Sequence, residues 1–243
     1  MAARDKVYFA ADVHLGLKAG DADERERRFV NWLKSLPCEE TRALYLLGDI
    51  WDFWYEYRDV IPRIGTRVLA ELIHLMDAGV EVCFVPGNHD IWCYSYFESI
   101  GIRKVAQPLF EQIGGKSFLL GHGDALGGAK WTYRLMLKLF HGRFFQTMFS
   151  TLHPWIAFRL GLDWSSSNRR KHGGYHFLGE KEPLYRFCVE KCAQNKVDYC
   201  IFGHFHDSVD MTLPGGERLV VLKDWIGGGV HYACFDGEEL TVC

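Results

Sequence analysis

Five short polar motifs, each following a short apolar run, constrain this chain of 243 residues more than any other feature. They carry carboxylate, imidazole and amide side chains, which suit divalent metal ions and disfavour a thiolate site. A pair of such ions is suited to hydrolysing phosphate esters, so the motifs predict a two-metal centre. In chain order the motifs are Asp12-Val13-His14, Gly48-Asp49, Gly87-Asn88-His89-Asp90, Gly121-His122-Gly123-Asp124 and Gly203-His204-Phe205-His206.

The apolar runs alternate with amphipathic helical patterns, which predicts a layered α/β fold. Ligands of open α/β sheets gather beyond the carboxyl ends of the strands, so the five motifs are expected to meet at one site. The expected helices span residues 22–36, 63–78 and 183–195. The expected strands span residues 6–11, 43–47, 80–85, 116–120, 198–202, 219–222 and 230–235.

Composition indicates a chain that folds without covalent cross-links. It is 48% hydrophobic and 15% aromatic, and a chain of this length buries roughly 70–75% of its unfolded surface. We therefore expect residues 1–243 to form a single domain. The eight cysteines include no CxxC pair, which favours a reduced protein of the cytoplasm. We expect no signal peptide and no membrane-spanning segment, while a peripheral place on the cytoplasmic face of the inner membrane stays open.

Residues 129–175 interrupt the alternation of strands and helices and predict an inserted helical cap. Between residues 129 and 172 there are eight Lys or Arg residues and one acid, so this segment carries +7 and the remainder of the chain −10. Two interpretations stay open: a helical hairpin packed on the body with its cations in solvent, or a cap that holds acyl chains and docks on an anionic membrane. The aromatic residues of the segment are Trp131, Tyr133, Phe140, Phe144, Phe145, Phe149, Trp155, Phe158 and Trp164.

Spacing within the motifs suggests how the side chains share metal ions. Side chains two apart on an extended backbone point the same way, so Asp12 and His14 are expected to address one ion, and His204 and His206 form a similar pair. Asp49 leaves a buried strand, where a carboxylate is costly unless it is paired or bound to metal. It is therefore the expected bridge between two ions.

The densest motif, residues 87–90, offers several roles. Asn88 provides a neutral amide oxygen for a metal, and His89 can act as an acid or as a donor to phosphate. Asp90 is expected to accept a hydrogen bond from the His89 imidazole and fix its tautomer. Asp124 is expected to cap a turn or helix, or to support a ligand, rather than to bind metal. Any one motif also fits an ordinary turn, but their order and common position favour a site.

The series D-x-H, GD, GNH(D), GH and GHxH resembles the calcineurin-like metallophosphoesterase superfamily from residue 12 to residue 206. The resemblance implies an α/β two-sheet sandwich flanked by helices, with His89 and Asp90 as catalytic residues. It implies two divalent ions, with Mn²⁺ favoured and iron or zinc as alternatives. One ion would be held by Asp12, His14, Asp49 and His206, and the other by Asp49, Asn88, His122 and His204.

The chain also resembles a narrower group, the UDP-2,3-diacylglucosamine diphosphatases of lipid A synthesis, at residues 48–54, in the helical insert and at residues 165–171. This resemblance implies hydrolysis of a lipid-linked nucleotide to UMP and an acylated sugar 1-phosphate. The best-described branch of that group has arginine after the asparagine, where this chain has His89. The substrate-binding residues would be Asn88, His89, Ser167, Arg169, Arg170 and Lys171.

Other functions fit parts of the sequence. The metal motifs alone also allow a phosphoprotein, a cyclic nucleotide or a nucleotide pyrophosphate as substrate, although the apolar insert argues for a lipid. A non-catalytic scaffold of the same fold is disfavoured, because all seven ligand positions and His89 are kept. The negative charge outside the insert weighs against a nucleic-acid partner. The sequence leaves the oligomeric state open.

Overall fold

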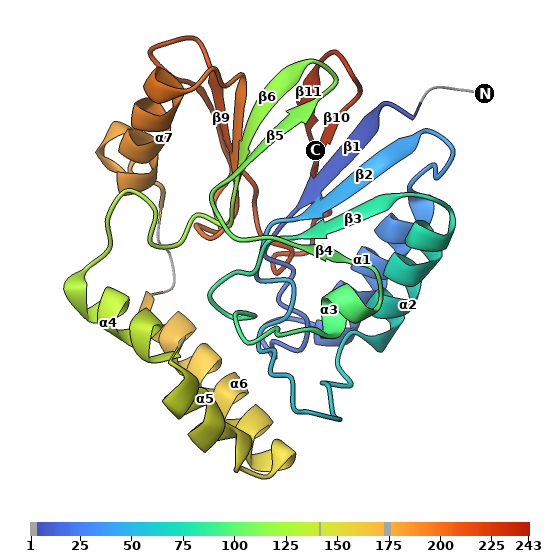
Figure 1. Ribbon diagram of the computed structural model, residues 1–243, viewed down its shortest axis with the longest axis vertical. Coiled ribbons are helices and arrows are strands. Elements are labelled where there is room, and N and C mark those ends of the chain that lie inside the picture. Colours follow the sequence, from blue (N-terminus) through green and yellow to red (C-terminus); the bar gives the residue numbers. More distant parts are fainter. Residues whose placement is uncertain (1–3, 141, 173–175) are drawn as a thin grey trace.

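The computed structural model of this chain describes residues 4–140, 142–172 and 176–243, and the side chains of residues 166–172 are outside that description. Two β-sheets lie face to face, with helices on their outer faces (Figure 1). This four-layer α/β sandwich confirms the expected fold class. A group of three helices extends from one end of the sandwich, where the polar motifs gather.

The first sheet has the strand order β11-β10-β1-β2-β3-β4. Strands β1 to β4 run parallel, and β10 pairs antiparallel with β1. Buried apolar residues fill most of β1, β2 and β3, as expected for strands covered on both faces. The strands are β1 (Lys6–Ala10), β2 (Thr41–Leu46), β3 (Glu81–Phe84), β4 (Arg103–Lys104), β10 (Ala233–Phe235) and β11 (Leu240–Val242).

The second sheet has the strand order β5-β6-β7-β9-β8. Its three inner strands run parallel, and both edge strands are antiparallel to their neighbours. The parallel strands of both sheets therefore end in polar loops, and these loops form the site. The strands are β5 (Leu109–Ile113), β6 (Lys116–Leu120), β7 (Tyr199–Phe202), β8 (Val209–Thr212) and β9 (Arg218–Val221).

The alternation of side chains along β1 divides the core into layers. Val7 and Phe9 face the second sheet and pack in the cluster that contains Phe118, whereas Tyr8 and Ala10 face the helices on the other side. This period of two is the normal geometry of a strand. Helices α1 (Ala22–Ser35) and α2 (Thr66–Asp77) cover the first sheet, and α7 (Pro183–Gln194) covers the second. Two short helices, α3 (Tyr96–Ser99) and η1 (Gly179–Lys181), lie in connections.

Three helices form the expected cap between β6 and α7: α4 (Trp131–Phe140), α5 (Arg143–Ser150) and α6 (Pro154–His172). The cap packs on Phe53, Tyr55 and Trp92, which lie in the loops that follow β2 and β3. The Tyr55 hydroxyl donates to the Gln146 carbonyl at 2.9 Å, and Trp92 Nε1 donates to the Phe140 carbonyl at 2.8 Å. The cap is therefore attached to the loops that carry the metal motifs.

The outer face of the cap leaves large apolar side chains in solvent. Trp131 is 74% exposed, Phe144 73% and Trp155 65%. Phe140, Phe149 and Phe158 instead pack against the body. One side of the cap therefore packs on the body, as the first interpretation expects, and the other side is exposed to solvent. The acyl-chain and membrane interpretation stays a prediction. Within the described ranges, the helices include none that is long and apolar enough to cross a membrane.

Candidate metal centre

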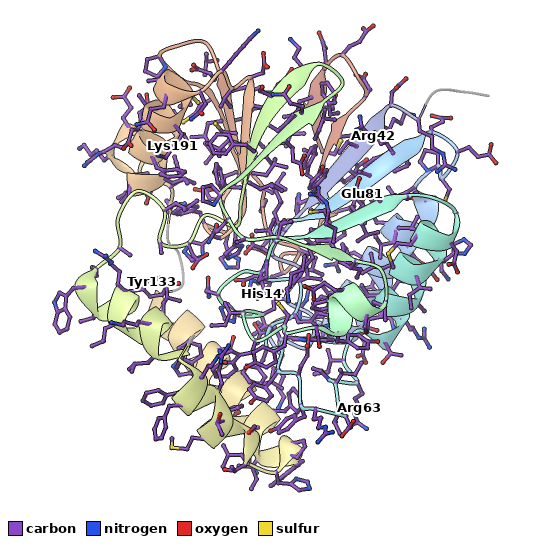
Figure 2. The ribbon with its side chains drawn as sticks, viewed as in Figure 1. His14, Arg42, Arg63, Glu81, Tyr133 and Lys191 are labelled. Carbon is purple, nitrogen blue, oxygen red and sulfur yellow. The ribbon has the colours of Figure 1, made fainter. Side chains whose placement is uncertain are left out.

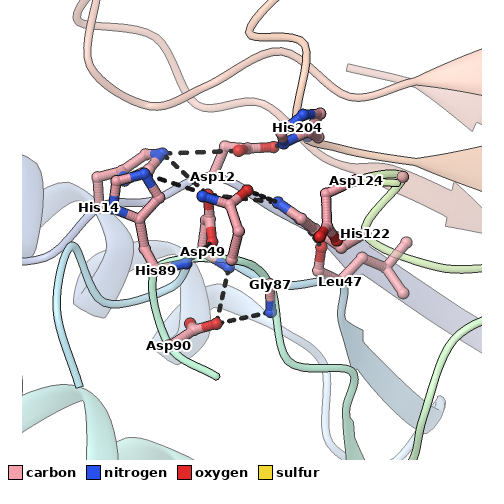
Figure 3. Close-up of polar contacts among 12 residues, drawn as sticks. Asp12, His14, Leu47, Asp49, Gly87, His89, Asp90, His122, Asp124 and His204 are labelled. Atoms are coloured by element: carbon pink, nitrogen blue, oxygen red, sulfur yellow. Dashed lines mark hydrogen bonds and ion pairs between the residues drawn. The ribbon is translucent and has the colours of Figure 1, made fainter. Parts of the chain in front are cut away.

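The five motifs meet between the ends of the two sheets and the cap, where His14 and Tyr133 lie in Figure 2. Strands β1, β2 and β3 of one sheet and β6 and β7 of the other each lead into one motif. The sequence prediction of one shared site is therefore confirmed in space. Figure 3 shows the side chains that converge.

Asp12, His14 and His206 bring three metal-binding atoms together, and we call them the first ligand group. Asp12 Oδ1 lies 3.6 Å from His14 Nε2 and 3.9 Å from His206 Nε2. The two imidazole rings stack, with centroids 4.9 Å apart. These residues come from loops at opposite ends of the chain, so only the folded state holds the group.

Asn88, His122 and His204 form the second ligand group, on the other side of Asp49. His122 Nε2 lies 3.3 Å from Asn88 Oδ1 and 3.3 Å from Asp49 Oδ2. His122 and His204 also offer ligand atoms together with Asp49. The structure therefore brings the residues predicted for each ion close together.

Asp49 lies between the two groups, as a bridging carboxylate requires. Its Oδ2 is 3.3 Å from His122 Nε2 on one side and 3.8 Å from His14 Nε2 on the other. Its Oδ1 accepts a hydrogen bond from the His89 backbone N–H at 2.9 Å. The side chain of Asp49 is 1% exposed, so a cation or a charged hydrogen-bond donor is needed to offset its burial.

The backbone reaches this arrangement in a way that the spacing argument did not predict. Asp12 and His14 have φ of 53° and 51°, and His204 and His206 have φ of 74° and 55°, so these pairs are left-handed rather than extended. Asp49 also has a positive φ, of 53°. Such conformations cost of order 1–3 kcal/mol each and persist where the surrounding structure enforces them. The pairs do converge, but through tight loops after the strands.

Glycines make room for the ligands. A Cβ at Gly87 would lie 2.2 Å from Asp49 Oδ1, and one at Gly203 would lie 2.3 Å from Asp12 Oδ2. At Gly48 it would lie 2.6 Å from His122 Nδ1. Any side chain at these positions would displace a ligand, which explains the glycines in the motifs.

The expected contact between Asp90 and the His89 imidazole is wrong. The buried Asp90 carboxylate accepts hydrogen bonds from backbone N–H groups instead, from Gly87 at 2.7 Å (Figure 3) and from Ile50 at 2.8 Å. Burial, together with the charge of Asp49, raises the pKa of Asp90 to about 7. Asp90 therefore ties the loops after β2 and β3 together, and the His89 ring finds a different partner.

That partner is Asp52, which the sequence argument did not single out. His89 Nδ1–H donates to the backbone carbonyl of Asp52 at 2.9 Å, and His14 Nδ1–H donates to Asp52 Oδ1 at 3.1 Å. Asp224 was missed as well: it accepts from His206 Nδ1–H at 3.1 Å. No local signal in the sequence pointed to either residue, because Asp52 lies 38 residues from His14 and Asp224 lies 18 residues from His206.

Asp124 supports a ligand rather than joining the centre, as expected. It accepts from Gln107 Nε2 at 2.5 Å and from the Tyr133 hydroxyl of the cap at 3.3 Å. Gln107 in turn accepts from the Gly123 N–H at 2.9 Å, which holds the loop after His122. The side chains of Ser167, Arg169, Arg170 and Lys171, expected to bind substrate, lie outside the described residues.

Burial and neighbouring charges shift the pKa values of the ligand side chains. Burial would raise the pKa of Asp49, but His122, His89 and His14 outweigh it and hold that pKa well below its usual range. Burial would lower the pKa of His122, yet Asp49 and Asp12 raise it well above its usual value. Burial and the neighbouring His122 lower the pKa of His204 to about 3. The pKa values of His122 and His204 are thus shifted in opposite directions in the centre without metal.

These residues fit divalent metal ions. Asp12 Oδ1 is buried and accepts no hydrogen bond from the part of the chain that the structure describes, while two imidazole nitrogens face it. A buried carboxylate oxygen in that position is stabilised by a cation. Imidazole, carboxylate and amide ligands suit manganese, iron and zinc.

Proteins of known sequence resemble this chain over much of its length. The calcineurin-like phosphoesterase family model matches residues 5–208. A UDP-2,3-diacylglucosamine hydrolase of Porphyromonas gingivalis is 35% identical over 98% of this chain and 97% of its own. One of that name from Neisseria gonorrhoeae is 33% identical over 60% of this chain and 59% of its own.

Two solved structures share the fold at low identity. The protein TT1561 of Thermus thermophilus has a TM-score of 0.50 and is 14% identical, covering 98% of each chain. A dimetal phosphatase from Danio rerio has a TM-score of 0.50 and is 15% identical, covering 96% of this chain and 92% of its own. With the family match over most of its length, the chain belongs to the calcineurin-like phosphoesterases and is a metal-dependent hydrolase.

Proposed function

We propose that this protein hydrolyses the diphosphate of UDP-2,3-diacylglucosamine to UMP and 2,3-diacylglucosamine 1-phosphate in lipid A biosynthesis. The observation that carries the proposal is the pair of ligand groups that share Asp49, next to a cap with an open apolar face. The relative from Porphyromonas gingivalis, which matches nearly the whole chain, bears the name of that hydrolase. The chain acts in this proposal as a single domain, 1–243, with the cap inserted at about 129–175.

The ligand groups would hold two divalent ions, Mn²⁺ in our proposal. Asp12, His14 and His206 would hold one, and Asn88, His122 and His204 the other, with Asp49 between them. Bound ions would stabilise charge on the phosphoryl group and acidify a water. The chain's own task is to fix these ligands before substrate arrives, so that no reorganisation is needed during the reaction.

His89 would contact the substrate directly. Its side chain is 13% exposed, whereas those of His14 and Asp49 are almost fully buried. Because Nδ1 donates to the Asp52 carbonyl, Nε2 faces Asp49 and the metal ligands. From there Nε2 can donate to a phosphoryl oxygen or hold the proton for the departing group, and such a role is typically worth ~10²–10⁴-fold in rate.

The cap would supply the lipid part of the specificity. Each acyl methylene buried against it contributes about 0.8 kcal/mol, so even a short groove would dominate binding of the lipid over that of a soluble nucleotide. Ser167, Arg169, Arg170 and Lys171, late in α6, would contact the polar part of the substrate, with Asn88 and His89 at the reacting phosphate.

The open face of the cap would also contact an anionic membrane. Exposed aromatic side chains and cations occur together on it, a composition that suits the interface of a bilayer. A peripheral place on the cytoplasmic face of the inner membrane would bring the centre to a lipid substrate. The cations of the described part of the cap are Lys130, Arg134, Lys138, Arg143 and Arg159.

A comparison of substrates tests the proposal. Mn²⁺-loaded protein in detergent is given either UDP-2,3-diacylglucosamine or UDP-N-acetylglucosamine, which has a single acetyl group in place of the two long acyl chains, and UMP is measured. We expect UMP from the lipid at a kcat/KM at least 100-fold higher. Equal rates for both would reject the lipid specificity, and cleavage of simple phosphodiesters alone would reject the substrate.

A further inference from the structure

The two histidines of the first ligand group are each held from behind by a carboxylate. His14 Nδ1–H donates to Asp52 Oδ1 and His206 Nδ1–H donates to Asp224 Oδ2, both at 3.1 Å. The Asp52 side chain is fully buried and that of Asp224 is 14% exposed. Both rings therefore turn Nε2 toward the same oxygen, Asp12 Oδ1.

In the second ligand group, the described hydrogen bond behind the His122 imidazole goes to a neutral group. His122 Nδ1–H donates to the backbone carbonyl of Leu47 at 2.9 Å, and the oxygen ligand beside it is the amide of Asn88. The nearby carboxylate of Asp124 accepts from Gln107 and Tyr133. Asp49 is common to both groups, so its charge does not make one group bind metal more tightly than the other.

This difference in charge has a predictable effect on metal binding. A carboxylate behind an imidazole fixes its tautomer and makes the ring a more basic ligand. A hydrogen bond to an ionised acceptor is also roughly twice as strong as one to a neutral acceptor. The first ligand group has, in addition, the charge of Asp12, where the second has the neutral Asn88. Both effects favour a cation at the first group.

We propose that Asp52 and Asp224 are positioning residues that make the first ligand group the tighter metal site, so that the two ions load in a fixed order. This inference rests on the proposed function, because it takes the centre to hold two ions. Asp52 acts on both His14 and His89, through its carboxylate and its backbone carbonyl respectively. Filling of the first site therefore orders the segment that also holds His89.

A titration of the metal-free protein with Mn²⁺, in which electron paramagnetic resonance counts the free ion, tests the proposal. The wild type should bind two ions with dissociation constants at least tenfold apart. Asp52→Asn and Asp224→Asn should each weaken the tighter step roughly 10–100-fold and leave the weaker step unchanged. Asn88→Ala should weaken the weaker step and leave the tighter step unchanged. Asp210→Asn, which removes the same charge from the edge strand β8, should change neither step.

Crystals grown with one equivalent of Mn²⁺ locate the tighter site. Anomalous density among Asp12, His14 and His206 is the expected result, and density at the second ligand group would overturn the proposal. Equal affinities in the wild type, or a loss of only the weaker step in both Asn variants, would also overturn it. Circular dichroism of the metal-free variants separates weakened binding from misfolding.

The loading order and the proposed function can fail independently of each other. Two equivalent ions in an enzyme that releases UMP would reject the loading order and keep the function. Failure to bind any ion would reject both.

Discussion

His89 Nδ1–H donates to the backbone carbonyl of Asp52 at 2.9 Å, and this contact decides which ring nitrogen faces the ligands. The free nitrogen, Nε2, lies 3.9 Å from Asp49 Oδ2. The ring is thus held by a backbone group that substitution of a side chain does not remove. Its orientation at the rim of the centre is what makes His89 the candidate acid.

His89→Ala should lower kcat by roughly 10²–10⁴-fold, because the donor to the phosphate is lost. Since His89 also offers a ligand atom together with His14 and Asp49, the decisive control is metal content. Two ions per chain in the variant, with little turnover, would support the catalytic role. Loss of one ion would show that His89 is a ligand, and full turnover would remove it from the mechanism.

Metal binding should release protons, because a ligating imidazole must be neutral. Asp49 and Asp12 overcome the effect of burial and raise the pKa of His122 well above its usual value, so near pH 7 this ring is protonated before metal binds. His204, with its pKa near 3, has no proton to lose. Metal competes with a proton, so affinity should rise with pH.

Calorimetry in two buffers of different ionisation enthalpy measures this release. We expect about one proton from His122 at pH 7 and a smaller release at higher pH. Heats that do not depend on the buffer would contradict the protonation of His122.

Gly87→Ala should damage the centre without any change of a ligand. The added Cβ would lie 2.2 Å from Asp49 Oδ1 and 2.6 Å from the Asp49 backbone nitrogen, so Asp49 must move. Overpacking of this kind typically costs about 1–3 kcal/mol. We expect weaker Mn²⁺ binding and a lower thermal midpoint, measured by titration and by circular dichroism.

Gly227→Ala is the matched control, since a Cβ there meets nothing within 4 Å. If both glycine variants bound Mn²⁺ as the wild type does, the close approach of Gly87 to Asp49 would not matter for metal binding.

The exposed aromatics of the cap should govern membrane binding. Trp131, Phe144 and Trp155 are each more than half exposed, so changing all three to serine should leave the fold intact. Binding to anionic vesicles at low salt, measured by co-sedimentation, should fall at least tenfold, because the three most exposed aromatic side chains of the cap are lost. Phe110→Ser, at a residue 45% exposed on β5 outside the cap, should have no effect. Unchanged vesicle binding by the triple variant would show that this face of the cap is not the membrane-binding surface.

The main elements and the convergence of the motifs were predictable because each motif follows a short apolar run that forms a buried strand. The strand predicted at Lys116–Leu120 is found with the same bounds, and the helix predicted at 22–36 ends one residue earlier. Strands β4, β5, β8 and β11 were not predicted. They have two to five residues, and β8 alternates half-buried and exposed side chains, too short a pattern to stand out.

The supporting carboxylates could not be predicted, because their partners are distant in sequence. Asp52 lies 38 residues from His14, and Asp224 lies 18 from His206. Asp90 was misassigned because its place next to His89 suggested a contact, whereas the turn directs its carboxylate to the backbone of Gly87. Pairing within a loop depends on backbone conformation, which spacing alone does not determine.

The most direct test of the central claim is hydrolysis of UDP-2,3-diacylglucosamine in H₂¹⁸O by the Mn²⁺-loaded protein, followed by mass spectrometry of the products. Attack by water on the phosphorus next to uridine should give ¹⁸O-labelled UMP and unlabelled 2,3-diacylglucosamine 1-phosphate. Metal-free protein should give neither product. Intact substrate after incubation with protein that holds two ions would contradict the account.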